Sequence, residues 1–542
     1  MNSVAGASNS QDHRSVPVCL YRMPQKLRLY SQGWRLCALF AFTLALATCG
    51  GSSSPPSEST PPENPVGSNL VQISSDSFTV APGQHATQVE PHLVSNGATL
   101  VATFQIGRIP KSAGVGGGAT DIGWATSTDG GATWTHGSLS GLTKGEGSGP
   151  YDAASDPVVA YDAKHNVWMI ASLPLSSASQ TPAVVVSRST DGVNWGNPVS
   201  VDSTSVSSDK NWIACDSWPN SSHYGNCYME WDDPLNNDEI LMSTSNDGGL
   251  TWGAAMPTAN SAGGIGGQPL VQPNGNVVVP IETSVMASFM STDGGASWTA
   301  PATISNIQFH ANAGGIRSGP LPSVAVDGSG TIWTVWQDCR FRASCSTNDL
   351  VYSTSTDGVN WSAVTRIPID DTSSAVDHFI PGIGIDPATS GASAHVALHY
   401  YFYPLASCSA STCQLFVGYI SSANGGSTWN APTTLTAAPM QLNWLPTSQN
   451  GLMVGDYIAT AFVNGVPHGV FAVAQAATAN QGATTFQEAT YTASGLSVKT
   501  SGRQLSSAQD KPQHKLTDKI EREVPEKGII PPTRRRTRRS AK

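Results

Sequence analysis

The sequence predicts an all-β fold built from repeated four-stranded units, and two observations support this prediction. A turn motif of the form Ser-Thr-Asp-Gly-Gly-Ala-Thr-Trp recurs six times, with its tryptophans 46 to 68 residues apart. Short runs of alternating apolar residues, typical of β-strands, lie between the motifs. The composition agrees, since 39% of the residues are hydrophobic, only 12% are charged and 53 are glycine. These values argue against a disordered chain, a coiled coil or a helix-rich cytosolic enzyme.

Residues 1–48 have the pattern of an export signal. Basic residues precede an apolar run, residues 36–47, which has the length of a signal-peptide core and is short for a membrane span. The run ends in Leu46-Ala47-Thr48-Cys49, which resembles a bacterial lipoprotein signal with Cys49 as the lipidated residue. Ordinary cleavage after Ala47 is the alternative, and translation from Met23 would still supply a full signal. We therefore expect an exported protein, either a bacterial cell-envelope lipoprotein or a secreted protein.

Three regions follow the signal. Residues 49–68 are rich in Gly, Ser and Pro and fit a flexible tether. Residues 69–495 carry the repeats, and residues 496–542 form a basic tail that we expect to be disordered. The region between the signal and the tail, residues 49–495, holds 10 basic and 32 acidic residues. This negative charge repels phosphate backbones and excludes nucleic acid as the main partner.

Six cysteines of the repeat region form three close pairs in the sequence. In an exported chain, an even number of neighbouring cysteines predicts disulfides that pin loops. Each disulfide would close a short loop and contribute roughly 2–3 kcal/mol to stability. There is no C-x-x-C spacing, so we expect no metal site at these cysteines. The predicted disulfides are Cys215–Cys227, Cys339–Cys345 and Cys408–Cys413.

The repeated motif has a physical role in a β-hairpin turn. Gly allows positive φ, the Asp or Asn side chain accepts hydrogen bonds from backbone N–H groups, and Trp packs against the sheet. Six copies at this spacing predict a β-propeller of six or seven four-stranded blades. Seven alternating runs favour seven blades, with Leu70 to Phe78 pairing with the last strands. The copies end at Trp134, Trp195, Trp252, Trp298, Trp361 and Trp429.

These turns are Asp boxes, and from about Asn69 to Gly495 the chain resembles the sialidase-like propellers of bacterial neuraminidases. In that family the boxes are structural and lie on the outer rim, so their Asp residues are not candidates for catalysis. The resemblance implies a glycan pocket at the central opening, where the first strand of each blade begins. The family mechanism uses three arginines to hold the substrate carboxylate and a Tyr nucleophile activated by a Glu. An Asp in a mobile loop is its acid and base.

Carried over by position, the family mechanism points to five residues of this chain. Tyr457, at the start of the first strand of the last repeat unit, would be the nucleophile. Asp121, which follows the first hairpin, would be the acid and base. Arg317, Arg108 and Arg340 would hold the anionic group of the substrate.

Departures from the family pattern leave the activity open. Val89-Glu90-Pro91 stands where the family has Arg-Ile-Pro, the family's Glu falls near Gly266, and its second arginine falls near Ile281. Three interpretations therefore remain: a glycan-recognising propeller without catalysis, an active exo-glycosidase of the exo-α-sialidase type, or a propeller that binds proteins. Binding to glycans without bond cleavage would favour the first, and release of a free sugar would establish the second.

No cofactor is expected from the motifs. The acidic clusters Asp232-Asp233 with Asp238-Glu239, and Asp370-Asp371, offer oxygen ligands for a structural Ca²⁺, although acidic surface turns are the commoner explanation. We expect a monomer whose partner is a glycan or glycoconjugate. Contact with a membrane is expected only through the lipid anchor.

Overall fold

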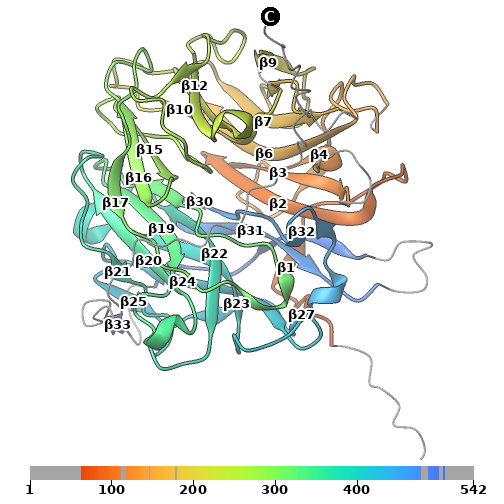
Figure 1. Cartoon of the computed structure of the whole chain (residues 1–542), viewed down its shortest axis with the longest axis vertical. Helices are drawn as coiled ribbons and strands as arrows, with labels where there is room; N and C mark the ends of the chain where they lie inside the picture. The colour runs from red at the N-terminus through yellow and green to blue at the C-terminus, as the bar shows by residue number, and fades with distance from the viewer. Residues whose placement is uncertain are drawn as a thin grey trace, which may run out of the picture. The chain divides into compact units, whose positions relative to one another are not determined.

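The computed structural model describes residues 63–110, 117–145, 147–176, 180–204, 206–477, 486–499 and 504–506. The predicted export signal, Cys49 and most of the predicted tether and tail lie outside these residues. The described part is almost entirely β-structure (Figure 1). No helix in these ranges has the length and apolarity to cross a membrane. The helical segments of the described part are short 3-10 turns, namely η2 (Pro234–Asn236), η3 (Ala313–Gly315), η4 (Ala343–Cys345), η5 (Gly391–Ser393) and η6 (Leu442–Trp444).

The strands form antiparallel groups of four in chain order, each strand pairing with the next. The first three groups are β2 (Gln84–Asn96), β3 (Thr99–Arg108), β4 (Ala119–Ser127) and β5 (Thr135–Ser138); β6 (Ala153–Asp162), β7 (Val167–Leu175), β8 (Val184–Ser189) and β9 (Val199–Asp202); and β10 (Asp209–Cys215), β11 (Cys227–Asp233), β12 (Glu239–Ser245) and β13 (Met256–Pro257). Further groups are β14 (Leu270–Val271), β15 (Val277–Glu282), β16 (Met286–Ser291) and β17 (Ala302–Ser305); and β18 (Ser323–Val326), β19 (Ile332–Asp338), β20 (Asp349–Ser355) and β21 (Thr365–Arg366).

The remaining strands complete the arrangement from both ends of the chain. One group contains β22 (Asp377–Ile385), β23 (Val396–Tyr403), β24 (Gln414–Ser422) and β26 (Thr433–Thr434), and β27 (Met440–Gln441) also pairs with β24. The last group contains β30 (Ala459–Val463), β31 (Val466–Ala474), β32 (Glu488–Ala493) and, from the N-terminal side, β1 (Leu70–Gln72). Because β1 is antiparallel to β32, the beginning of the described chain is bound to its end.

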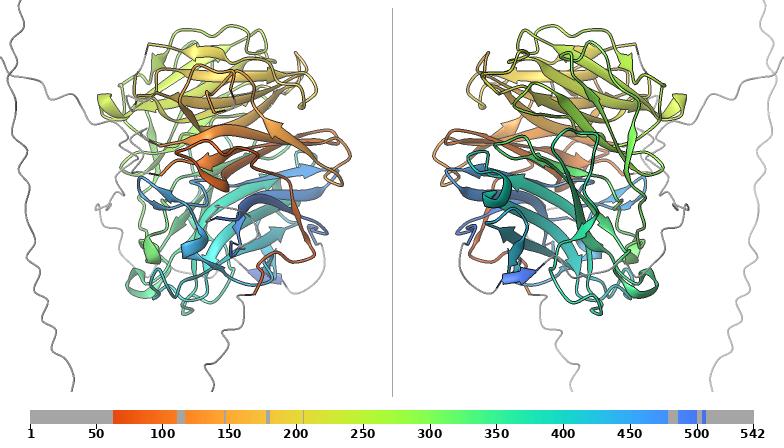
Figure 2. Two further views of the ribbon diagram at one scale, coloured as in Figure 1. Left: turned by 90° about the vertical axis from the view of Figure 1, so that its right-hand side faces the viewer. Right: turned by 90° about the vertical axis from the view of Figure 1, so that its left-hand side faces the viewer.

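The first strands of these groups make a closed ring. In chain order, β2, β6, β10, β14, β18, β22 and β30 each contact the next, and β30 returns to β2. Figures 1 and 2 show the closure, with the blue strands of the last group beside the orange strands of the first. The starts of these strands are thereby brought together, although they are spread over the whole sequence.

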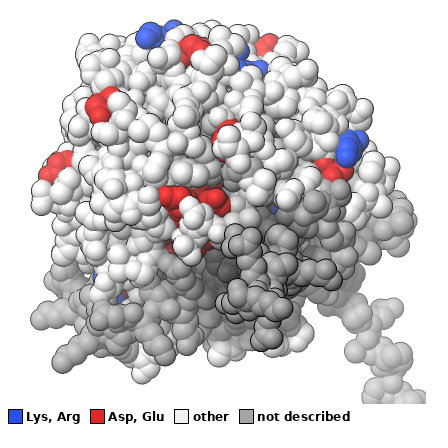
Figure 3. All heavy atoms as spheres, turned by 45° about the horizontal axis from the view of Figure 1, so that its top comes forward, with Lys and Arg blue, Asp and Glu red and all other residues white. Residues whose placement is uncertain are grey.

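The core lies between neighbouring groups, where one sheet covers the next. Val101 and Ile122 of the first group pack with Val159, Trp168 and Ile170 of the second. Because sheets cover both faces, strands such as β4 and β7 are buried along their whole length. On the face drawn in Figure 3, charged side chains are scattered among uncharged residues, as expected for a chain with 12% charged residues.

The six repeated turns share one set of hydrogen bonds. In the first copy, the Ser127 hydroxyl donates to Asp129 Oδ1 at 2.8 Å, and the Gly131 N–H donates to Ser127 Oγ at 2.9 Å. Asp129 Oδ1 also accepts the Thr133 N–H at 2.9 Å, and Oδ2 accepts the Thr133 hydroxyl at 2.6 Å. Gly130 and Gly131 have φ of 73° and 89°, which explains the two glycines. The bonds from the Ser hydroxyl and the backbone N–H to the Oδ1 atom recur around Asp191, Asp247, Asp293, Asp357 and Asn424. The bond to the second side-chain atom varies, since an Asn amide donates it to Asp191 and Asp357, and Asn424 itself donates to the Thr428 hydroxyl.

The structure contains the three disulfides that the spacing predicted. Cys215–Cys227 joins the end of β10 to the start of β11. Cys339–Cys345 closes the loop that follows β19, and Cys408–Cys413 closes the loop between β23 and β24. All three therefore fasten loops or hairpin ends, as expected of short-range pairs.

In the structure, contacts cross both predicted boundaries of the repeat region. At the N-terminal side, the Ala437 N–H donates to the Pro65 carbonyl, so part of the predicted tether lies on the body. At the C-terminal side, β33 (Gln504–Ser506) pairs with β25 (Thr428–Asn430), and Lys499 accepts a hydrogen bond from Asn430. The physical reason is that β25 leaves an edge whose N–H and C=O groups need partners. These contacts join residues on the two sides of the predicted boundary at residue 496.

Candidate functional site

Four first strands of the ring share a backbone irregularity, which lies in the middle of β2 and in the first half of β6, β10 and β22. Glu90, Asp156, Lys210 and Ile380 have φ between 49° and 59°, and the pairing with the second strand shifts register at each. Positive φ is uncommon for residues with a Cβ, and a bulge redirects the side chain away from the regular alternation. Three of the four residues are charged. The bulges therefore turn three ionisable side chains out of the regular alternation of their strands.

These side chains meet at one end of the ring in a buried ionic cluster, which we call the central cluster. Its members are Glu90, Asp156, Lys210, Arg317 and Asp456. Arg317 Nε donates to Asp456 Oδ1 at 2.6 Å, and its Nη2 donates to Oδ2. Lys210 Nζ bonds the same Oδ2 and lies 3.7 Å from Asp156 Oδ2. Because Lys210 belongs to β10 and Asp456 precedes β30, the contact crosses the ring.

Glu90 connects the cluster to a chain of polar side chains in the first group. Its Oε1 accepts the Asp456 N–H at 3.3 Å, and its Oε2 accepts a hydrogen bond from Gln105 Nε2. Gln105 Oε1 accepts from Arg108 Nη1 at 2.9 Å, and Arg108 Nη2 donates to Gln449 at 2.8 Å. Glu90, Gln105 and Arg108 have no exposed surface. The cluster is thus one end of a continuous polar network.

Burial and mutual charge separate the pKa values of the carboxyl groups. Burial, with the charges of Asp156 and Asp456, raises the pKa of Glu90 to about 8. Burial also opposes ionisation of Asp456, but the charges of Arg317 and Lys210 hold its pKa below the ordinary value. At neutral pH, Glu90 is therefore mainly a neutral acid and Asp456 is a carboxylate. Opposite shifts in neighbouring carboxyl groups are a feature of acid–base sites.

A short hairpin spans the entrance to the central cluster. Its strands are β28 (Thr447–Ser448) and β29 (Gly451–Leu452). On one side, Gln84 Nε2 donates to the Thr447 carbonyl at 2.8 Å. On the other side, the Arg317 N–H donates to the Leu452 carbonyl at 2.7 Å. The side chains of Lys210, Arg317 and Asp456 are only 5–7% exposed.

A cavity of about 470 Å³ lies inside the ring beyond the bulges. Every first strand contributes lining residues, and most of them are apolar, such as Leu93, Val159 and Ile383. His92 and Trp212 also line it, with ring centroids 4.8 Å apart. None of the lining residues belongs to the central cluster, so the cavity is a separate and mainly apolar space inside the ring.

The predicted nucleophile, Tyr457, lies beside the cluster with its hydroxyl engaged. The hydroxyl donates to the Pro157 carbonyl at 3.0 Å, and the ring lies 5.0 Å from Trp212. Burial, followed by the charges of Glu90, Asp156 and Asp456, raises the pKa of Tyr457. A nucleophilic tyrosine needs the reverse change, because the phenolate is the reactive form. The geometry of this state gives Tyr457 a packing role.

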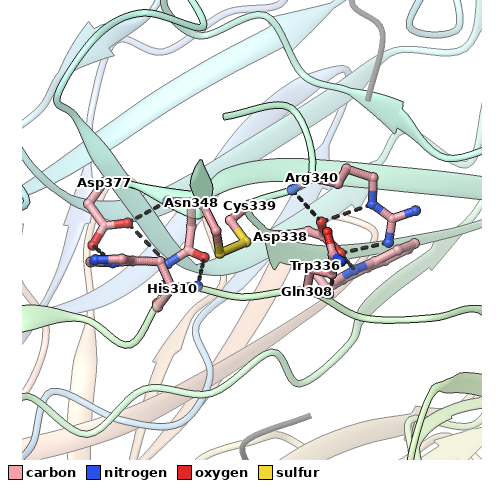
Figure 4. Close-up of a disulfide and its surroundings, with 9 residues drawn as sticks. Gln308, His310, Trp336, Asp338, Cys339, Arg340, Asn348 and Asp377 are labelled. Carbon is pink, nitrogen blue, oxygen red and sulfur yellow. Dashed lines mark hydrogen bonds and ion pairs between the residues drawn. A yellow bond between two sulfur atoms is a disulfide. The ribbon is translucent and has the colours of Figure 1, made fainter. Parts of the chain in front are cut away.

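The other predicted site residues are divided between two places. Arg317 belongs to the central cluster and Arg108 to its polar network. Asp121 is buried in β4 with its Cα opposite Ile106. The Arg340 guanidinium makes two hydrogen bonds to Asp338, at 2.9 and 2.7 Å, and lies over the Trp336 ring (Figure 4). It also donates to the Ser305 hydroxyl and the Asn306 carbonyl. None of these partners belongs to the central cluster, so the structure brings together Arg317, Arg108 and Tyr457 but not Arg340.

The acidic clusters considered for Ca²⁺ have different surroundings from those expected of surface turns. Asp232 is fully buried, and burial raises its pKa. Asp370 accepts hydrogen bonds from Arg342 and Arg366, which also bond Asp349. Asp349, Asp370 and His378 approach one another as metal ligands would. The two guanidinium groups already supply the positive charge there, so an ion pair network accounts for this group.

Sequence reasoning missed Glu90, Asp156, Lys210 and Asp456 as a set. A signal was present, because four of the seven alternating runs begin next to a charged residue, three of them acidic. A charged residue at the start of a buried strand is costly unless it has partners or a function. Taken together, the four positions could have indicated a shared polar site.

No family model and no curated protein matches the chain. Solved structures do. A protein of unknown function from Dyadobacter fermentans is 15% identical, with 65% of this chain and 99% of that chain covered and a TM-score of 0.43. An α-L-arabinanase from Penicillium chrysogenum is 13% identical (78% and 97% covered, TM-score 0.38), and an intramolecular trans-sialidase from Ruminococcus gnavus is 16% identical (73% and 92% covered, TM-score 0.33). At these low values the similarities carry no argument about function.

Proposed function

We propose that this chain is an exported, seven-bladed Asp-box β-propeller that recognises a glycan at the central cluster. Each four-stranded group is one blade, and β1 completes the last of them. The observation that carries the proposal is the central cluster itself. Five ionisable side chains from distant segments meet at one end of the ring, at the usual position of a ligand site in a ring of blades.

The chemistry of the cluster favours a polyhydroxylated ligand. Carboxylates, amides and a neutral carboxyl group offer both acceptors and donors for sugar hydroxyls, and Trp212 and His92 supply aromatic surface nearby. Arg317 is already bound to Asp456 through two of its nitrogens. A substrate carboxylate would have to displace this internal partner. The central cluster therefore fits sugar hydroxyls better than the three-arginine carboxylate clamp of the sialidase mechanism.

Glycan binding can be tested with the purified full chain on a glycan array. We expect wild type to bind a defined subset of glycans and Arg317→Gln to lose that binding. Arg188→Gln is the matched control, because Arg188 lies in β8 and donates to the Gly248 carbonyl away from the cluster. Both variants must keep the wild-type circular dichroism spectrum. An array on which folded wild type binds nothing would refute the proposal.

The second candidate function is that of an exo-glycosidase, and the opposite pKa shifts of Glu90 and Asp456 favour it. Most glycosidases place one carboxylic acid and one carboxylate on either side of the scissile bond, and the sialidases with a Tyr nucleophile are an exception. In this chain Glu90 would donate the proton and Asp456, released from Arg317, would act as the carboxylate. Tyr457 and Asp121 are the nucleophile and acid/base of the alternative family mechanism.

Release of 4-methylumbelliferone from sialic acid and neutral sugar conjugates separates these mechanisms. Loss of turnover in Glu90→Gln, with Tyr457→Phe active, supports the carboxyl pair. Loss in Tyr457→Phe alone supports the family mechanism. An inactive wild type that still binds glycans leaves recognition without catalysis as the function.

Export and lipidation are part of the proposal and rest on the sequence. In cells fed a fatty-acid analogue, wild type should be labelled and Cys49→Ala should not. A mature N-terminus at residue 48, by contrast, would show ordinary signal cleavage. The two outcomes distinguish a cell-envelope lipoprotein from a secreted protein.

A further inference from the structure

A second polar site lies beside the disulfide Cys339–Cys345, in the segment that leads to Arg317. Hydrogen bonds on both sides of this disulfide hold residues 308–310 in place (Figure 4). The Gln308 N–H donates to Asp338 Oδ2 at 3.1 Å, and its carbonyl accepts the Cys339 N–H at 2.7 Å. The segment is therefore positioned by a covalently closed loop.

Asn348 holds His310 through the backbone of that residue. The His310 N–H donates to Asn348 Oδ1 at 2.7 Å, and Asn348 Nδ2 donates to the His310 carbonyl at 2.7 Å. The imidazole Nδ1 lies 3.4 Å from Asp377 Oδ2. The His310 side chain is 28% exposed, and its Nε2 has no hydrogen-bond partner among the described residues. The backbone of His310 is thus fixed, and its imidazole stays partly exposed.

Asp377 does not depend on His310 for its hydrogen bonds. It is fully buried, and its Oδ1 accepts from the Asn348 N–H at 2.7 Å and from Asn348 Nδ2 at 3.0 Å. Its Oδ2 accepts from Asn312 Nδ2 at 2.8 Å. Amide donors therefore hold this carboxylate in place, so it can orient the imidazole and stabilise its protonated form.

The pair lies close to the central cluster. Asn312, which bonds Asp377, accepts a hydrogen bond from the Ser318 hydroxyl at 2.6 Å, and Ser318 is next to Arg317. Asp377 is also the first residue of β22, so it stands at the same end of the ring as the other strand starts. A ligand at the entrance of the central cluster would meet His310 at its edge.

We propose that His310, held by Asp377 and Asn348, is a contact residue for the carboxylate of an acidic sugar at the entrance to the central cluster. This inference rests on the proposed glycan function and names its ligand class. The protonated imidazole donates from Nε2 to a carboxylate oxygen, a charge-assisted hydrogen bond. Arg317 could make such a contact only by leaving Asp456, whereas His310 keeps its internal partners while it binds.

The pH dependence of binding follows from the same geometry. The Asp377 carboxylate, 3.4 Å from Nδ1, raises the pKa of His310, although partial burial acts against it. Asp377 is the charged side chain, among the described residues, that acts on this imidazole. The protonated form is present below the raised pKa and is lost as pH rises through it. Binding of an acidic sugar should weaken over that range more in wild type than in His310→Gln, which lacks the imidazole, because ionisation of Glu90, whose pKa is about 8, acts on both proteins alike.

The test compares glucuronic acid with glucose, which differ at one carbon, by titration calorimetry with the full chain at pH 6 and pH 8.5. We expect glucuronic acid to bind at least tenfold more weakly in His310→Gln at pH 6, and at least tenfold more weakly in wild type at pH 8.5. His136→Gln removes an exposed imidazole from β5 and should change neither value. In wild type, imidazole NMR should show that glucuronic acid shifts Nε2 of His310.

The possible outcomes separate the inference about His310 from the proposed glycan-binding function on which it rests. If glucuronic acid binds wild type, is lost in Arg317→Gln and is unaffected by His310→Gln, the inference is overturned and the glycan function stands. If neither these sugars nor the glycan array gives binding, both are overturned. Asp377→Asn gives a readout that needs no ligand, because the pKa of His310 by NMR should fall. An unchanged pKa would overturn the proposed pair.

Discussion

The central cluster and the repeated turns use the same residue type in opposite ways. Asp129 is exposed, and all its partners lie within four residues along the chain. Asp456 is buried, and its side-chain partners Arg317 and Lys210 are 139 and 246 residues away. Side-chain and backbone hydrogen bonds from Thr133 lower the pKa of Asp129 to about 2. For Asp456 the lowering comes from two cations that only the ring brings near.

The difference teaches that conspicuous repetition and functional placement are separate properties. The repeated turns recur because each needs only a short local sequence to satisfy its own hydrogen bonds. The central cluster has no motif, because each member comes from a different blade. Its energy depends on all members being present, since each buried charge needs its partners.

The largest effect should follow removal of a cation from the central cluster. Arg317→Ala leaves the buried Asp456 with Lys210 as its remaining cluster cation, so we expect a loss of about 3–5 kcal/mol in the free energy of unfolding. Urea denaturation checks this value. Arg188→Ala, in β8, should cost far less, and equal losses in the two variants would contradict a special role for the cluster.

The pH dependence of stability should change in Glu90→Gln. The pKa of Glu90 is about 8 in the folded chain and 4.5 ordinarily, so folding favours the protonated form. This contribution is complete below pH 4.5 and is lost as pH rises toward 8, at up to about 1.4 kcal/mol per pH unit. Gln imitates the neutral acid, so the variant should lose less stability between pH 5 and pH 8. Parallel stability curves for the two proteins would show that Glu90 is ionised in the fold.

A repeated turn should respond modestly and locally. In Asp247→Ala, the N–H groups of Leu250 and Thr251 lose their acceptor, as at a helix N-terminus without its cap. We expect a cost of about 1 kcal/mol, measured by urea denaturation, with glycan binding unchanged. Asn424 occupies the same position in the last copy, so Asp247→Asn should cost less than Asp247→Ala. Loss of glycan binding in either variant would contradict a purely structural turn.

Tyr457→Phe should cost about 1 kcal/mol, because it removes the hydrogen bond to the Pro157 carbonyl and keeps the ring packing. Urea denaturation of wild type and Tyr457→Phe checks this value. The same variant tests the chemistry, since unchanged turnover in an active protein would exclude the tyrosine as nucleophile.

The smallest change in global stability should come from the hairpin at the entrance. Gln84→Ala removes its hydrogen bonds to Thr447 and should accelerate hydrogen exchange at residues 447–452 without lowering the melting temperature appreciably. Exchange in β4 is the internal control and should stay slow. If residues 447–452 exchange no faster, the hairpin is held by other contacts, and entry to the cluster would need a different opening.

Much of the fold could be predicted from the sequence because its signals are local. The turn motif encodes its own hydrogen bonds, and alternation of apolar residues encodes strands. The disulfides were predictable for the same reason, since their cysteines are only 5 to 12 residues apart. The extent of the body was less predictable, because β33 has partners far away in β25.

The candidate site was predictable only in part. Arg317, Arg108 and Tyr457 were named from their order along the chain, and the structure places them in or beside the central cluster. Arg340 was named by the same reasoning, yet it is bound to Asp338, two residues away. A short-range partner of this kind competes with any distant role, and sequence order alone does not reveal it.

By itself, the sequence determined the all-β class, the repeated unit, the disulfide pairs and the acidic character of the body, because each depends on residues close together in the chain or on composition. Only the tertiary structure decided which charges meet. Closing the ring brings Glu90, Lys210 and Asp456 together, and the bulges turn their side chains to one place. The same closure raises the pKa of Glu90 and lowers that of Asp456, since the pKa of a buried acid depends on neighbours that the chain supplies from a distance.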